Sequence, residues 1–188
     1  CPTCARVIEL DSPQTVSHYL IGLPAGKRIC LGFPLTDHDS DSPAELIATL
    51  LEDGFVRMVS GTRIVDLNNP DAVSKLDADT SSQLVLVDRL LTGQLTTDRV
   101  RESLETAFAY GQGNCVVLVE CESPESGERE IDGRPWRELY FSTQLECRRC
   151  SRTIPIPKPT LFSPLSPMGA CPKCEGTGVV RDWDADRI

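Results

Sequence analysis

The chain has 188 residues, of which 40% are hydrophobic and 25% charged, and its net charge is −9. This length fits one domain of moderate size with an appendage, or two small domains. No apolar run is long enough to cross a membrane and no basic, apolar leader opens the chain, so we expect no membrane segment and a cytoplasmic location. Nine cysteines, several of them in C-x-x-C pairs, suit a reducing compartment where thiolates bind metal.

The chain opens on a C-x-x-C pair, Cys1-Pro-Thr-Cys4, without a methionine before it. We therefore interpret the sequence as a fragment and the pair as a possible half of a zinc site completed by residues upstream. Inert thiols are the alternative. A thioredoxin-like redox pair is a further alternative, but such a pair is expected to follow a strand within a βαβ unit.

A first helix is predicted over 12–22, where Ser12 is a favoured N-cap and Pro13 suits the first helical position. A strand follows over 27–35. Pro34 indicates that the end of this strand lies at a sheet edge, because proline cannot donate a hydrogen bond to a neighbouring strand.

A second helix is predicted over 42–54, since Ser42-Pro-Ala-Glu45 matches a capping box and Gly54 supplies a left-handed stop. Residues 55–67 are expected to form a hairpin that turns at Ser60-Gly61. The remaining predicted elements are an irregular stretch at 68–80, a strand at 83–91, a helix capped by Thr97 and ending before Gly111, a strand at 114–121, a charged loop at 123–137 and a last strand at 139–142. Strands and helices without strict alternation indicate an α+β fold, a small mixed or antiparallel sheet with about three helices.

Cysteines and histidines outside the C-x-x-C pairs lack neighbouring ligands in the sequence. We expect Cys30, Cys115 and Cys121 to be structural residues. His18 and His38 are expected to lie at the surface.

Two further cysteine pairs, Cys147-Arg-Arg-Cys150 and Cys171-Pro-Lys-Cys174, give the spacing C-x2-C-x20-C-x2-C. This spacing is typical of a tetrahedral zinc site with four thiolate ligands. The proline-rich run between the pairs is too poor in apolar residues to form a core, so we expect zinc to stabilise this module. Four filled ligand positions indicate a structural role; two disulfides or four thiols are the alternatives.

Charge is unevenly distributed along the chain. Residues 1–145 carry 12 basic and 23 acidic side chains, whereas 146–181 carry six basic and two acidic ones. A polyanion would be repelled by the first part and attracted by the second. The candidate DNA-contacting residues are therefore Arg148, Arg149, Arg152, Lys158 and Lys173. The alternative is that these side chains are only solvated.

The sequence contains no catalytic constellation. It has no glycine-rich loop that would hold a phosphate, and no Ser/His/Asp grouping that the spacing suggests. We predict a binding and structural module with no catalytic residues.

Residues 161–178, LFSPLSPMGACPKCEGTG, resemble a stretch of the UvrA family, the damage-recognition ATPases of bacterial nucleotide excision repair. Shorter matches follow the order of that family over essentially the whole chain: Pro24–Arg28, Gly54–Arg57, Val87–Leu90, Ser103–Ala107, Leu139–Ser142 and Asp184–Ile188. The resemblance implies a span inside the first ATP-binding half, between the Walker A region and the ABC signature. We accordingly expect the end of an upstream segment at 1–9, a UvrB-binding domain at 10–140 and a zinc module of the signature domain at 141–188.

The resemblance also implies roles for individual residues. Arg57 and Arg89 match basic residues that in the family face acidic groups of UvrB. The cysteines of the two later pairs carry over as zinc ligands, and the family's leading C-P-x-C or C-P-x-H pair matches Cys1 and Cys4. ATP, magnesium, DNA binding and a homodimer are implied only for the full-length protein.

Several positions depart from the family pattern. Pro164-Leu165 replaces Phe-Asn, Lys158-Pro-Thr160 replaces Glu-Pro-Arg, and 37–42 is acidic where the family is basic. These departures weaken any expectation of DNA contact through the first domain and allow a divergent paralogue with a different partner. A DnaJ-like zinc chaperone module is the other alternative, because 171–178 matches C-x-x-C-x-G-x-G.

Overall fold

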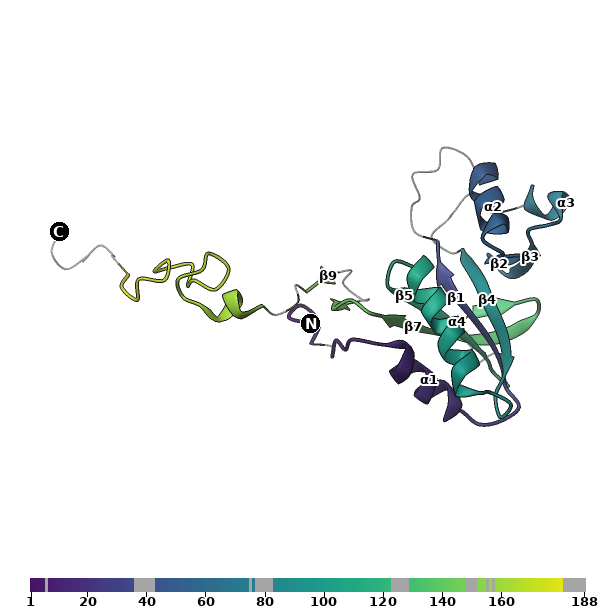
Figure 1. The fold of residues 1–188 in the computed structure, drawn as a ribbon, viewed down its shortest axis with the longest axis horizontal. Helices are drawn as coiled ribbons and strands as arrows, with labels where there is room; N and C mark the ends of the chain where they lie inside the picture. Colours follow the sequence, from purple (N-terminus) through teal and green to yellow (C-terminus); the bar gives the residue numbers. More distant parts are fainter. Residues whose placement is uncertain are drawn as a thin grey trace.

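The computed structural model describes residues 1–5, 7–35, 43–74, 76, 83–122, 129–147, 152–154, 156 and 158–180. Its centre is a seven-stranded sheet in the order β3-β2-β4-β1-β5-β7-β6, antiparallel at every pairing (Figure 1). The strands are β1 (Arg28–Pro34), β2 (Arg57–Ser60), β3 (Arg63–Asp66), β4 (Leu84–Leu91), β5 (Asn114–Glu120), β6 (Arg129–Ile131) and β7 (Arg134–Ser142). The helices are α1 (Pro13–Ile21), α2 (Pro43–Glu52), α3 (Pro70–Val73) and α4 (Thr97–Tyr110). The predicted α+β class is confirmed.

A local signal accounts for the start of α1. The Ser12 hydroxyl accepts a hydrogen bond from the Thr15 backbone N–H at 3.2 Å, and the Thr15 hydroxyl accepts one from the Ser12 N–H at 2.9 Å. This reciprocal pair satisfies two donors that the helix cannot satisfy itself. The cap of α4 is Thr96, one residue before the predicted Thr97. Ser42, the predicted cap of α2, lies outside the described residues.

Residues alternate between the two faces of the sheet. Along β1, Ile29 and Leu31 pack with α1 and α4, whereas Cys30 packs on the opposite face with Val59 and Trp136. All five are buried. A third cluster lies beneath α2 and includes Phe33, Ile47 and Leu50 in its core. Apolar burial on both faces explains why β1, β4 and β5 read as nearly continuous hydrophobic runs.

The sheet curls until its two ends meet on the face away from α1 and α4. The Asp132 N–H donates to the Thr62 carbonyl at 2.9 Å, and Arg129 donates to the Gly61 carbonyl at 2.9 Å. Asp132 also accepts from the Ile64 N–H at 3.4 Å. The β2–β3 turn is thereby tied to the β6–β7 hairpin, and the cluster around Cys30 and Trp136 lies inside a partly closed barrel.

One sequence-based expectation is wrong. The predicted charged loop at 123–137 contains β6 and the start of β7, joined at Asp132-Gly133 with φ of 48° and 70°. Two consecutive positive φ values are what a two-residue hairpin turn requires, and Asp-Gly favours them. The strand that ends at Pro34 is central in the sheet order, but its Pro34 end lies at a local edge on the side of β5. Its pairing with β5 covers only Ile29–Gly32, so Pro34 lies beyond that ladder.

The chain after β7 forms the short strands β8 (Glu146–Cys147) and β9 (Arg152–Thr153) and then an arm with the 3-10 helix η3 (Pro159–Phe162). Figure 1 shows this arm running away from the sheet. The arm exposes apolar side chains, among them Phe162 and Leu165. None of the described helices has the length and apolar character that crossing a bilayer requires.

Candidate metal centre and docking face

A group of three cysteines lies where the two ends of the sheet domain meet. The Sγ atoms of Cys1, Cys4 and Cys147 all lie within 4.8 Å of one another. The Sγ atoms of Cys4 and Cys147 are 3.5 Å apart, too far for a disulfide bond of about 2 Å. Zinc–thiolate bonds of about 2.3 Å in a tetrahedron place sulfur atoms about 3.8 Å apart. The spacing and the all-sulfur donor set therefore fit a zinc ion.

A pair of hydrogen bonds between Asp11 and Ser142 brings the cysteines together, although Cys4 and Cys147 are 143 residues apart in the sequence. The Asp11 N–H donates to the Ser142 carbonyl at 2.8 Å, and the Ser142 N–H donates to the Asp11 carboxylate at 2.8 Å. The segment before α1 is thus held against the segment after β7. Figure 1 shows the N-terminus lying close to β9.

The two C-P-x-C pairs adopt the same turn. The Ala5 N–H donates to the Cys1 carbonyl at 2.8 Å, and the Glu175 N–H donates to the Cys171 carbonyl at 2.8 Å. Ala5 and Glu175 also share a positive φ, of 57° and 49°. In the second pair, hydrogen bonds from the Cys174 and Lys173 backbone N–H groups lower the pKa of the Cys171 thiol. Hydrogen bonds to sulfur favour the thiolate, which is the form that binds metal.

The structure brings together only part of the predicted zinc set. Cys147 joins Cys1 and Cys4, and among the described residues Cys171 and Cys174 lie outside that group. Cys150 lies outside the described residues, so the set Cys147, Cys150, Cys171 and Cys174 stays a prediction. The sequence carried one signal for the observed group, namely matching C-x-x-C spacing at the two ends of the domain.

The two candidate partner-binding arginines lie on neighbouring strands and on one face of the sheet. Met58 pairs with Val85, which turns Arg57 to the face away from the core beneath α2. Arg89 pairs with Cys30, and so lies on that same face. Neither guanidinium forms an ion pair within the described part of the chain.

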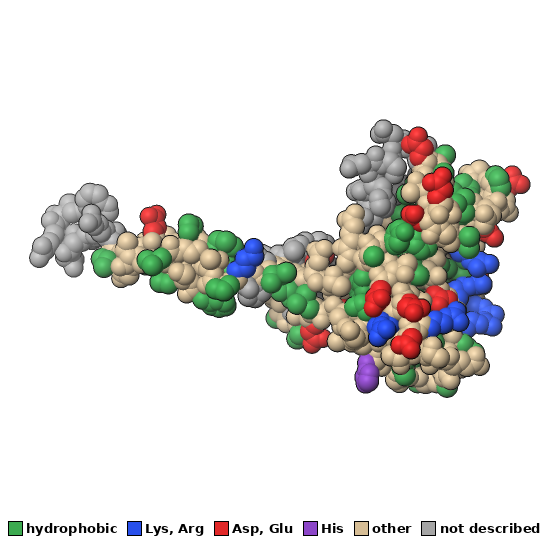
Figure 2. Space-filling view, viewed as in Figure 1, with side chains coloured by type: hydrophobic (Ala, Val, Ile, Leu, Met, Phe, Trp, Pro, Cys, Tyr) green, Lys and Arg blue, Asp and Glu red, His purple; other side chains and the backbone are tan. Residues whose placement is uncertain are grey.

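Asp88, the residue before Arg89, lies on the opposite face of the sheet and has partners there. Asp88 pairs with Leu31 and points toward α4, where Arg99 donates to its carboxylate at 3.0 and 3.1 Å. Ser103 adds a third hydrogen bond at 3.1 Å. Figure 2 shows acidic side chains in front and a row of Lys and Arg side chains along one side of the sheet domain.

The candidate DNA-contacting residues are placed only in part. Lys158 and Lys173 are exposed on the arm. Arg152 is in β9, where only its backbone is described. Arg148 and Arg149 lie outside the described residues, so DNA contact through this group stays a prediction.

Comparison with known proteins identifies the family of the domain. A profile of the UvrA interaction domain matches residues 11–121, which hold α1 to β5 and both candidate arginines, Arg57 and Arg89. The chain belongs to the UvrA interaction domain family. The UvrABC system protein A of Treponema pallidum is 32% identical over the whole chain, and that of Streptomyces coelicolor is 33% identical over the whole chain. The Escherichia coli K12 protein of the same name is 30% identical over 93% of the chain.

The match to the UvrA family extends beyond the profile. The cysteine group, β6 and β7 lie outside residues 11–121 but inside the region aligned with the first two relatives. The chain spans about a fifth of the length of these relatives, 20% and 18%. It is thus similar to one segment of a UvrA protein.

Proposed function

We propose that this chain is the part of a UvrA protein that docks UvrB, and that it does so through the sheet face that carries Arg57 and Arg89. The supporting observation is that both arginines lie on that face without an ion pair to a described residue, in a chain whose net charge is −9. A guanidinium binds a carboxylate through two parallel hydrogen bonds, which suits an acidic protein surface. The full-length protein would act in nucleotide excision repair as an ATPase that binds DNA as a homodimer.

The cysteine group has a structural role in this proposal. Cys1, Cys4 and Cys147 would hold a zinc ion, and Cys150 is the natural fourth ligand because it completes the C-x-x-C pair of Cys147. An ion with four thiolate ligands has no open position for a substrate. It would hold the segment before α1 against the segment after β7. The DnaJ-like and thiol-redox alternatives do not account for the family match over 11–121.

Calorimetric titration with UvrB tests the docking proposal. We expect Arg57→Glu and Arg89→Glu each to weaken binding at least 30-fold, since charge reversal in a desolvated pair costs about 2–5 kcal/mol. Arg137→Glu is the matched control. Arg137 is an exposed strand arginine that pairs with Val119 and so lies on the opposite face. Unchanged affinity of both variants, or no binding by the unmodified chain, contradicts the proposal.

A further inference from the structure

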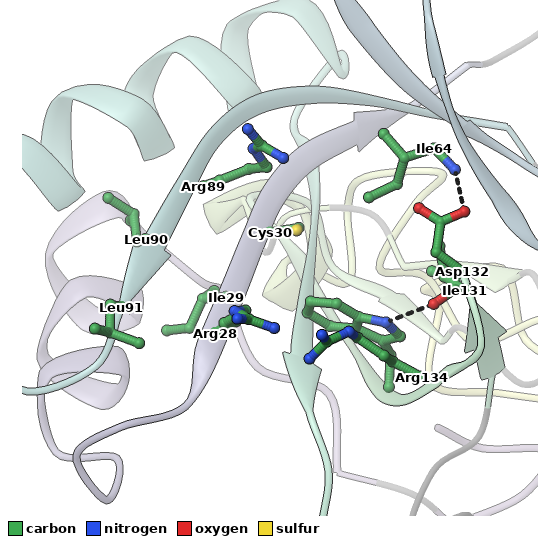
Figure 3. A pocket seen from close by; sticks show the side chains of 11 residues that line it. Arg28, Ile29, Cys30, Ile64, Arg89, Leu90, Leu91, Ile131, Asp132 and Arg134 are labelled. Atoms are coloured by element: carbon green, nitrogen blue, oxygen red, sulfur yellow. Dashed lines mark hydrogen bonds between the residues drawn. The ribbon is translucent and has the colours of Figure 1, made fainter.

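A cavity of about 600 Å³ opens on the sheet face opposite α1 and α4, between β1, β4 and the β6–β7 hairpin. Figure 3 shows its side chains converging from these separate elements. The lining residues that matter most are Arg28, Cys30, Arg89, Asp132, Arg134 and Trp136. Among them, only Arg89 is a partner-binding candidate of the sequence analysis.

Three guanidinium groups from three strands stand at the rim of this cavity. Arg28 and Arg134 both donate to Oε1 of Glu120, at 3.4 and 2.5 Å. Glu120 is only 19% exposed, whereas the two arginine side chains are 55% and 51% exposed. Glu120 therefore holds two exposed guanidinium groups in place, and Arg89 forms no ion pair with a described residue.

The floor of the cavity is apolar and nearly inaccessible to water. Cys30, Ile131 and Trp136 are 3%, 1% and 4% exposed. The Trp136 indole N–H donates to the Ile131 carbonyl at 3.3 Å, so this polar group already has a partner and the floor presents no free donor there. Burial raises the pKa of the Cys30 thiol to about 11, even though Arg89 lowers it, which agrees with a floor of low polarity.

The charges around the cavity select among anions. Three arginines face two carboxylates, Asp132 on the wall and Glu120 beside the rim, which leaves one net positive charge. A phosphate dianion carries one negative charge more than this net positive charge balances, and a nucleic-acid backbone offers no apolar group to the floor beside its phosphate. A single carboxylate next to an apolar group matches both the charge and the floor.

We propose that this cavity is a socket for one glutamate or aspartate side chain of a protein partner, with an adjacent apolar side chain of that partner packed over Trp136. Arg28 and Arg134 are then specificity-determining residues beside Arg89, and Glu120 is their positioning residue. The proposal deepens the proposed function and rests on it for the identity of the partner as UvrB. That the partner presents an acidic side chain is inferred from the cavity alone.

The first test uses UvrB and substitutions that avoid Arg57 and Arg89. We expect Arg28→Ala and Arg134→Ala each to weaken the Kd for UvrB tenfold or more in calorimetry. Arg134→Lys is expected to recover only part of this loss because it keeps the charge and loses the planar fork. Arg137→Ala, on the other face, is the matched control. If both alanine variants bind within twofold of the unmodified chain while Arg57→Glu abolishes binding, UvrB docks without the socket and the proposal is overturned.

The second test does not depend on UvrB. The probe is a capped Leu-Glu-Leu peptide, and the readout is the Trp136 indole N–H signal, assigned with Trp183→Phe. We expect a saturable shift that Arg89→Ala abolishes and that capped Leu-Gln-Leu reproduces at least tenfold more weakly. An equal response to the glutamine peptide, no response at all, or a stronger response to inorganic phosphate overturns the carboxylate socket. A shift with the acidic peptide but no binding of UvrB would reject the proposed partner and keep the socket.

Discussion

Cys30 lies inside the partly closed barrel, opposite Arg89 on the neighbouring strand. Burial raises the pKa of its thiol from 9.0 to about 11, against the lowering effect of Arg89. Since the folded-state pKa lies above the unfolded one, the stabilisation is complete below about pH 9 and is lost as the pH rises toward 11. A shift of this size corresponds to about 2–3 kcal/mol.

Urea unfolding between pH 7 and pH 11 measures this effect. The unmodified chain should lose about 2–3 kcal/mol more than Cys30→Ala over the upper part of this range. Cys121→Ala is the control, because Cys121 is a partly exposed cysteine at the end of β5. Parallel curves for the unmodified chain and Cys30→Ala would show that burial does not control the ionisation of this thiol.

Among the elements, those with strong local signals were predictable. The Ser12 cap, the β2–β3 hairpin and the apolar run of β4 each carry the information in a few adjacent residues, although the turn falls at Gly61-Thr62, one residue after the predicted Ser60-Gly61. The β6–β7 hairpin was missed because charged residues surround its Asp132-Gly133 turn. Its order comes from tertiary contacts, including the ion pair of Arg129 with Glu138 at 3.5 Å. Strand formation of this kind depends on packing partners that no local window contains.

The Asp132-Gly133 turn gives a prediction for the hairpin. Gly133 has a φ of 70°, and a Cβ added there would meet no atom within 4 Å. Gly133→Val should therefore destabilise the protein by about 1–2 kcal/mol through backbone strain alone. Gly133→Asn is the matched control, because asparagine tolerates positive φ and should cost less than half as much. Equal urea midpoints for the two variants would argue against this turn conformation.

At the scale of the whole molecule, the cysteine group is the feature that the sequence foretold least. C-x-x-C spacing identifies pairs of ligands but does not say which pairs meet. The nearest pairs, at 147–150 and 171–174, were therefore matched with each other. The two-way hydrogen bonds of Asp11 with Ser142 place the first pair beside Cys147, and the match of 147–150 with 171–174 stays a prediction because Cys150 lies outside the described residues. This choice follows from the path of the whole chain, since both ends leave the sheet side by side.

Metal removal should loosen the segments before α1 and after β7 and leave the sheet folded. The three apolar clusters hold residues between Val16 and Trp136, and none of them includes a cysteine of the metal group. We therefore expect a chelator to shift the main urea transition by less than about 1 kcal/mol, while protease cleavage before α1 and after β7 rises at least tenfold.

Variants show which cysteines bind the ion that protects these segments from cleavage. Cys4→Ser should lower the zinc content and reproduce the cleavage pattern seen with the chelator, because it removes one sulfur of the observed group. Cys121→Ser, which lies outside the group, should keep both the ion and the resistance to cleavage. If Cys174→Ser alone loses the zinc, Cys147 pairs with the second turn as the spacing first indicated. If the chelator unfolds the sheet as well, the ion stabilises the whole core and not only the segments before α1 and after β7.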